Sequence, residues 1–69
     1  MNYQRLVKEL REKLILTQQE FANLLGVSFA SINRWETGRH EPTIKVKRMI
    51  VELCKENSID LEGKNNVSF

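Results

Sequence analysis

The sequence predicts an all-α fold in which four to five short helices form one compact bundle. Apolar residues recur at steps of three and four, as they do along the buried face of a helix. Capping residues and glycines separate these stretches where helices start and stop. A chain of 69 residues has room for one domain only. We expect this domain to span residues 1–62, and residues 63–69, which show no periodicity, to form a flexible tail.

The first helix is expected over residues 2–14. Its charged residues fall on the face opposite to the apolar residues, which makes the helix amphipathic. The apolar positions are Tyr3, Leu6, Val7, Leu10 and Leu14.

The second helix is expected over residues 18–25. Thr17 and Glu20 have the spacing of a capping box, in which each side chain accepts the backbone N–H of the other residue. Gly26 follows and can adopt the positive φ that ends a helix. The apolar residues of this helix are Phe21, Ala22, Leu24 and Leu25.

The third helix is expected over residues 28–36. Ser28 is a typical N-terminal residue, and its hydroxyl can cap the helix that it starts. Ile32 and Trp35 are three residues apart, so both lie on one face, and Gly38 is placed to end the helix. Trp35 on that inward face is expected in the core rather than as a base-stacking platform.

The fourth helix is expected over residues 43–56, after the Gly/Pro loop that ends at Pro42. Thr43 can cap it, and the charged residues again occupy the outer face. Residues 58–62 can add one short turn or a fifth helix. The apolar stripe of the fourth helix consists of Val46, Met49, Ile50, Leu53 and Cys54.

The second and third helices are joined by a turn of about four residues, which is the arrangement of a helix-turn-helix unit. Ala22 is small enough for a close helix crossing, and Gly26 permits the turn. Because Val27, Ile32 and Trp35 are expected to face inward, the remaining positions of the third helix face outward. These outward residues are Phe29, Ala30, Asn33 and Arg34. They lie near the N-terminal end of the third helix, which is the part of a helix that meets base edges when it lies in a major groove.

The string TQQEFANLLGVSFASINRWETGRHEPT, from Thr17 to Thr43, resembles the phage-repressor and Cro-like (XRE-type) helix-turn-helix family. Its most specific parts are the turn LGVS and the segment INRWE, followed by Gly38 and Pro42. With the first helix, the resemblance covers most of residues 3–55. It implies a lambda-repressor-like bundle that binds operator DNA, usually as a dimer, and regulates transcription in a bacterium or phage.

The resemblance also implies which residues contact double-stranded DNA. Base contacts are expected from Ser28, Phe29, Ala30, Asn33 and Arg34. Phosphate contacts are expected from Gln18, Ser31, Thr37, Arg39, His40, Thr43 and Lys45. Asn33 suits adenine and Arg34 suits guanine, and each bidentate pair discriminates by about 1–3 kcal/mol. The structural positions of the motif are Ala22, Gly26, Val27, Ile32 and Trp35.

Several of these residues have a second interpretation that does not involve DNA. Gln18 is then a solvated residue of the first helical turn, and Phe29 folds back into the core. Arg34 then forms an ion pair with Glu36 or Glu20, although exposed pairs contribute only about 0–1 kcal/mol.

The chain departs from the family after the fourth helix. Many members have a Gly-Val turn and a clear fifth helix there, whereas this chain has no glycine between Met49 and Asn57. We expect the dimer surface at the end of the fourth helix. Its apolar residues are Ile59, Leu61, Val67 and Phe69.

The positive charge of the chain is concentrated around the motif. The chain has a net charge of +2. The segment from Arg34 to Arg48 contains five Lys or Arg and two Glu, a net +3, so the remainder is slightly acidic. This asymmetry is typical of a nucleic-acid-binding surface when it adjoins such a motif.

Composition argues against several other classes. One cysteine cannot form an internal disulfide, and the polar N-terminus lacks the apolar run of a signal peptide or anchor, so we expect a cytoplasmic location without membrane contact. His40 and Cys54 lack the paired spacing of zinc ligands, so no metal or other cofactor is expected. One His, one Cys and one Tyr supply no convergent catalytic set, and we expect no enzyme activity.

The sequence leads us to expect a dimeric, sequence-specific transcriptional regulator whose half-sites are about 34 Å apart. Two alternatives remain open. An antitoxin would bind DNA and also hold a small toxin, through the acidic and partly apolar residues 52–62. A protein-interaction module would keep the fold without reading DNA, and the apolar Phe29 and Ala30 favour it.

Overall fold

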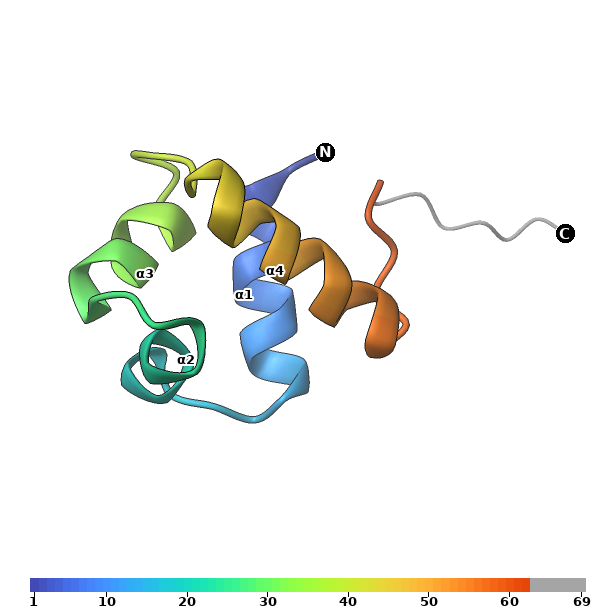
Figure 1. Cartoon of the computed structure of the whole chain (residues 1–69), viewed down its shortest axis with the longest axis horizontal. Coiled ribbons are helices and arrows are strands. Elements are labelled where there is room, and N and C mark those ends of the chain that lie inside the picture. Colours follow the sequence, from blue (N-terminus) through green and yellow to red (C-terminus); the bar gives the residue numbers. More distant parts are fainter. Residues whose placement is uncertain (63–69) are drawn as a thin grey trace, which may run out of the picture.

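A computed structural model describes residues 1–62 of the chain and confirms the all-α prediction (Figure 1). It contains α1 (Tyr3–Lys13), α2 (Gln18–Leu25), α3 (Phe29–Glu36) and α4 (Ile44–Glu56). Helix α1 packs against both α3 and α4, and α2 packs against α3. In the described part of the chain, no helix is long and apolar enough to cross a membrane.

Every helix begins at a capping side chain. Thr17 and Glu20 form the expected capping box, with each side chain accepting the other's backbone N–H at 3.1 and 2.9 Å. Ser28 and Thr43 cap α3 and α4 as expected, and Asn2 caps α1. All three have extended backbone, so these helices begin one residue after the start of the predicted ranges. An N-cap lies just outside its helix because only there can its side chain reach the free N–H groups of the first turn.

Every helix also ends in the same turn, in which the chain passes through a left-handed residue. The four left-handed residues are Ile15, Gly26, Gly38 and Ser58. After α1, the N–H groups of Ile15 and Leu16 donate to the carbonyls of Glu12 and Arg11, both at 3.1 Å. This is the Schellman motif, which satisfies the last carbonyls of a helix. It ends α1 at Lys13, one residue before the predicted boundary.

The core lies between α1 and the other helices. Leu24, which we expected on the apolar face of α2, is instead 52% exposed, because its neighbours Ala22 and Leu25 occupy the inward face. Cys54 is fully buried, and this desolvation raises the pKa of its thiol. The buried hydrophobic cluster consists of Leu6, Val7, Leu10, Phe21, Ala22, Leu25, Ile32, Trp35, Val46, Ile50, Cys54 and Ile59.

No fifth helix follows α4 within residues 1–62. The left-handed Ser58 turns the chain back, the N–H of Ile59 donates to the carbonyl of Cys54 at 2.8 Å, and the Ile59 side chain is only 7% exposed. Ile59 therefore belongs to the core and not to the surface on which we expected a dimer contact. Leu61 is half-buried and packs against the same core, while Val67 and Phe69 lie with the rest of residues 63–69 outside the described residues.

Candidate nucleic-acid interface

The turn between α2 and α3 sets the position of the exposed face of α3. Gly26 has φ +72°, and the N–H of Val27 donates to the carbonyl of Ala22 at 3.0 Å. Ala22 is fully buried, and Val27 is half-buried against the core. The two short helices are therefore joined by one tight turn (Figure 1), and both contribute buried side chains to the same core.

Helix α3 has one buried and one exposed face. Ile32 is fully buried and Trp35 is 7% exposed, so these two side chains fix the helix to the core. On the opposite face Ala30, Asn33 and Arg34 are exposed. Phe29 is 47% exposed, so it does not fold back into the core. The sequence-predicted base-contacting residues of α3 therefore lie on its outer face.

Four hydroxyl groups expected at the DNA surface already make internal hydrogen bonds. Ser28 Oγ accepts the N–H of Ser31 at 3.1 Å and lies 3.0 Å from Ser31 Oγ. Thr37 Oγ1 donates to the carbonyls at positions 33 and 34, at 2.9 and 3.1 Å, and Thr43 Oγ1 accepts the N–H of Val46 at 3.5 Å. Thr37 therefore uses its only O–H internally, and Ser28 and Ser31 share one O–H between them, whereas Thr43 only accepts and keeps its O–H free to donate to a phosphate.

A charged cluster that the sequence analysis missed joins α1, α2 and α3. Arg11 and Glu36 form a bidentate pair, with Nε–Oε2 at 2.6 Å and Nη2–Oε1 at 3.1 Å, and Arg11 also donates to the carbonyl of Leu16. Gln18 Nε2 donates to Glu36 Oε1 at 3.1 Å. The hydrogen bond to Glu36 raises the pKa of the Arg11 guanidinium, against the opposing effect of desolvation. We call Arg11, Gln18 and Glu36 the clamp.

The clamp argues against two of the alternative interpretations that do not involve DNA. Glu36 pairs with Arg11 and not with Arg34, while Glu20 is used in its capping box. Gln18 is not simply solvated, because its amide is held by Glu36 in a half-buried position. No sequence signal revealed the pairing, since Arg11 and Glu36 are 25 residues apart.

The start of α1 also holds the end of α3. Gln4 Nε2 donates to the carbonyl of Glu36 at 3.1 Å. Gly38, at φ +78°, passes so close that a Cβ atom there would meet the Gln4 amide oxygen at 2.8 Å. The position of α3 is thus fixed at both of its ends, by the turn at Gly26 and by the close approach of Gly38 to Gln4.

The remaining polar residues of this surface are free to act as donors. Among residues 1–62, no hydrogen bond or ion pair engages the side chain of Asn33, Arg34, Arg39, His40 or Lys45, and all five are exposed. The described residues contain no group of three or more His, Cys, Asp or Glu that could hold a metal ion.

Comparison with known proteins identifies the motif. The model of the helix-turn-helix family matches residues 7–59 of this chain. The chain belongs to the XRE-type helix-turn-helix family. Members of this family are DNA-binding domains, and the family is not a catalytic one.

One curated relative has a much longer chain than this helix-turn-helix protein. The chain described here is 47% identical over 50 residues to this relative, the type II methyltransferase M.SsoII of Shigella sonnei. The match covers 68% of this chain but only 13% of that methyltransferase. No solved structure gives a significant match.

Proposed function

We propose that this helix-turn-helix protein is a sequence-specific regulator of transcription that places α3 in the major groove of double-stranded DNA. The observation that carries the proposal is the outer face of α3, where Asn33 and Arg34 are exposed and make no internal side-chain bond within residues 1–62. Asparagine and arginine are the side chains that form bidentate pairs with adenine and guanine.

The phosphate contacts of the proposal surround this helix. Arg39, His40 and Lys45 supply exposed donors after α3, and Gln18 lies at the N-terminus of α2, where the helix dipole favours an anion. Thr43 can donate its free O–H to a phosphate, and Ser31 can do so when Ser28 supplies the O–H of their shared hydrogen bond. Thr37 would have to exchange its internal hydrogen bond for one to the phosphate. Such contacts orient the protein on DNA, while the bases determine its sequence preference.

The test is selection from a randomised duplex pool at about 150 mM salt, where non-specific binding is weak. We expect one enriched motif, arranged as an inverted repeat if two copies bind. Asn33→Ala and Arg34→Ala should each lose preference at one base pair per half-site, by about 1–3 kcal/mol. Lys55→Ala, in the last turn of α4, is the control and should keep the full motif. Unchanged preference in both α3 variants would contradict the site assignment.

A second candidate function is favoured by the relative. M.SsoII is a type II methyltransferase, and the matched segment is a small part of it, so a domain of this kind can belong to a larger enzyme. In that case the DNA-binding domain serves a methyltransferase, in the same chain or as a separate protein. The mass of the protein isolated from its source, and the proteins that co-purify with it, separate this candidate from a free regulator.

The antitoxin alternative makes a different prediction for the same purification, because a small toxin would co-purify. The segment 52–62 that we assigned to toxin binding contributes Cys54 and Ile59 to the core. Only its outer residues are therefore available to a partner.

A further inference from the structure

The loop between α3 and α4 contains an anion among the residues expected at phosphates. The Glu41 side chain is 66% exposed. Its neighbours Arg39, His40 and Lys45 are exposed donors, and their side chains make no internal hydrogen bond or ion pair within residues 1–62. A carboxylate beside such donors repels the phosphates that they attract, unless another group offsets its charge.

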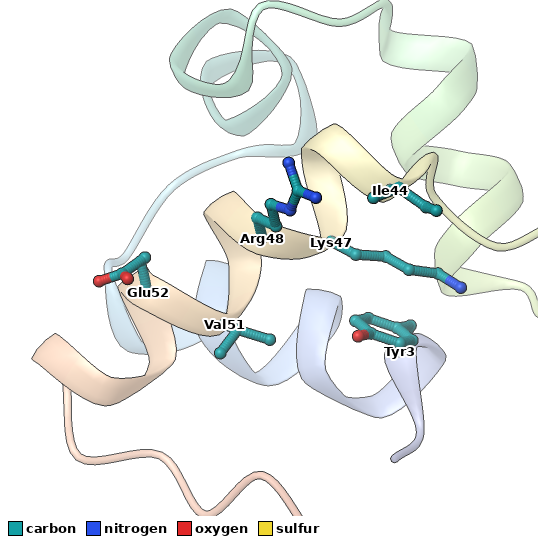
Figure 2. Close-up of a pocket in the computed structure, with 6 residues that line it drawn as sticks. All are labelled: Tyr3, Ile44, Lys47, Arg48, Val51 and Glu52. Carbon is teal, nitrogen blue, oxygen red and sulfur yellow. The ribbon is translucent and has the colours of Figure 1, made fainter.

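Lys47, in the first turn of α4, offsets the charge of Glu41. Its Nζ donates to Glu41 Oε1 at 2.8 Å and lies 4.9 Å from the centroid of the Tyr3 ring, close enough for attraction to the ring face. Figure 2 shows the Lys47 side chain extended over this ring, at the shallow pocket between α4 and the start of α1. The hydrogen bond lowers the pKa of the Glu41 carboxyl and raises the pKa of the Lys47 ammonium, which favours the charged form of both groups.

The ion pair also attaches the end of the loop to the rest of the fold. At the start of the loop, the Gly38 backbone lies against the side chain of Gln4 in α1. At its end, Glu41 is held by Lys47. Residues 39–40 lie between these two attachments. A segment that is already held in its bound conformation loses less conformational entropy when it binds, so the ion pair favours binding through these two residues.

We propose that Glu41 and Lys47 are positioning residues, which hold the donors of Arg39 and His40 in place for the phosphates of DNA. This role rests on the proposed function, because it concerns the same protein–DNA surface. Neither Glu41 nor Lys47 is among the residues expected at bases or phosphates. Lys47 is half-buried and already engaged by Glu41 and Tyr3, so it acts on the loop rather than on DNA.

The variant Glu41→Gln tests this role, because charge and position predict opposite effects for it. If only charge matters, removing an anion from a DNA-binding surface should strengthen binding. We expect instead that binding to the selected duplex weakens about threefold, since an exposed ion pair of ordinary strength is lost. Glu52→Gln is the matched control, at an exposed glutamate of α4 that forms no ion pair within residues 1–62, and it should not weaken binding. Fluorescence anisotropy at about 150 mM salt measures the affinities.

Two double variants separate position from net charge. E41Q/K47M has the net charge of the wild type but lacks the ion pair, so it should also bind about threefold more weakly. Arg39→Ala should reduce the affinity less in the E41Q background than in the wild type, because the phosphate contact of Arg39 is already impaired there. Residues that act independently would give additive effects instead. Circular dichroism should show an unchanged fold in every variant, since the exchanged side chains lie outside the hydrophobic core.

The results distinguish the positioning role from the proposed function. If the wild type binds the duplex with a steep salt dependence and E41Q binds it equally or more tightly, the positioning role is overturned and the proposed function stands. Strictly additive effects of Arg39→Ala and Glu41→Gln overturn the positioning role as well. A wild type that binds no duplex contradicts the proposed function, and the positioning role is then wrong too.

Discussion

Ile15 carries strain that its side chain does not offset by burial. It has φ +59° and is 87% exposed. A left-handed backbone costs an L-residue roughly 1–2 kcal/mol, and β-branched residues rarely adopt it. The ends of α2 and α3 use Gly26 and Gly38 at the corresponding position, where glycine avoids that cost.

We therefore expect Ile15→Gly to raise the free energy of unfolding by about 0.5–1 kcal/mol, the relief of strain being partly offset by the added entropy of the unfolded chain. Urea unfolding followed by circular dichroism measures the change. Gly26→Ala is the converse control and should destabilise the chain, although a Cβ atom there has no neighbour within 4 Å, because its φ is +72°. A loss of stability in Ile15→Gly would show that the isoleucine side chain makes a contribution larger than its strain.

At the scale of helices, the clamp determines how α3 lies against α1 and α2. The Glu36 side chain is 7% exposed and the Arg11 side chain 17%, so the pair is largely removed from water. Breaking a buried pair by removing one partner leaves an uncompensated charge, which costs about 3–5 kcal/mol. Such a loss is large for a chain of this size, whose total stability is of the order of 5 kcal/mol.

Arg11→Met should consequently destabilise the chain by about 3 kcal/mol, because Glu36 would keep only the amide of Gln18 as a partner. The midpoint of urea unfolding should fall with little change in the slope. Lys8→Met, which removes an exposed cation from the same helix, should change stability by less than about 0.5 kcal/mol. An equally small effect of Arg11→Met would mean that water replaces the lost hydrogen bonds.

The helices could be predicted from sequence because their causes are local. The capping box of Thr17 and Glu20 and the glycine at position 26 are read within a few residues, and the order and approximate ends of the four helices follow from them. The end of α1 was harder to predict from sequence, because Ile15 adopts a left-handed conformation that is typical of glycine and disfavoured for isoleucine. The partner of Glu36 could not be predicted from sequence. Arg11 and Glu36 are 25 residues apart and meet only because α1 packs against α3.

For the candidate site, periodicity was enough to predict which side of α3 faces outward. Once Ile32 and Trp35 are assigned to the core, Asn33 and Arg34 have to point away from it. The hydrogen bonds of Ser28, Ser31 and Thr37 could not be predicted in the same way. A hydroxyl can form hydrogen bonds of similar strength with several nearby backbone groups. Their expected roles at DNA stay predictions.

At the scale of the whole molecule, the distribution of charge determines how strongly the proposed DNA binding should depend on salt. The segment from Arg34 to Arg48 carries net +3 in a chain of net +2. Arg34, Arg39 and Lys45 are exposed there and form no ion pair in the described part of the chain. Binding through these cations releases counterions from DNA, and the logarithm of the binding constant then falls by about 0.9 per neutralised phosphate for each unit of log salt concentration.

We expect binding to the selected duplex to weaken steeply with salt, and Arg39→Ala to reduce the slope by about 0.9 per bound copy while leaving the preferred sequence unchanged. Fluorescence anisotropy titrations at several salt concentrations measure both. Arg34→Ala is the contrasting variant, because loss of a base contact should change the sequence preference itself. Lys55→Ala should alter neither. An affinity for the duplex that does not respond to salt would exclude binding through phosphates. A chain that does not bind the duplex at any salt concentration would instead favour the protein-interaction module, with its apolar contacts at Phe29 and Ala30.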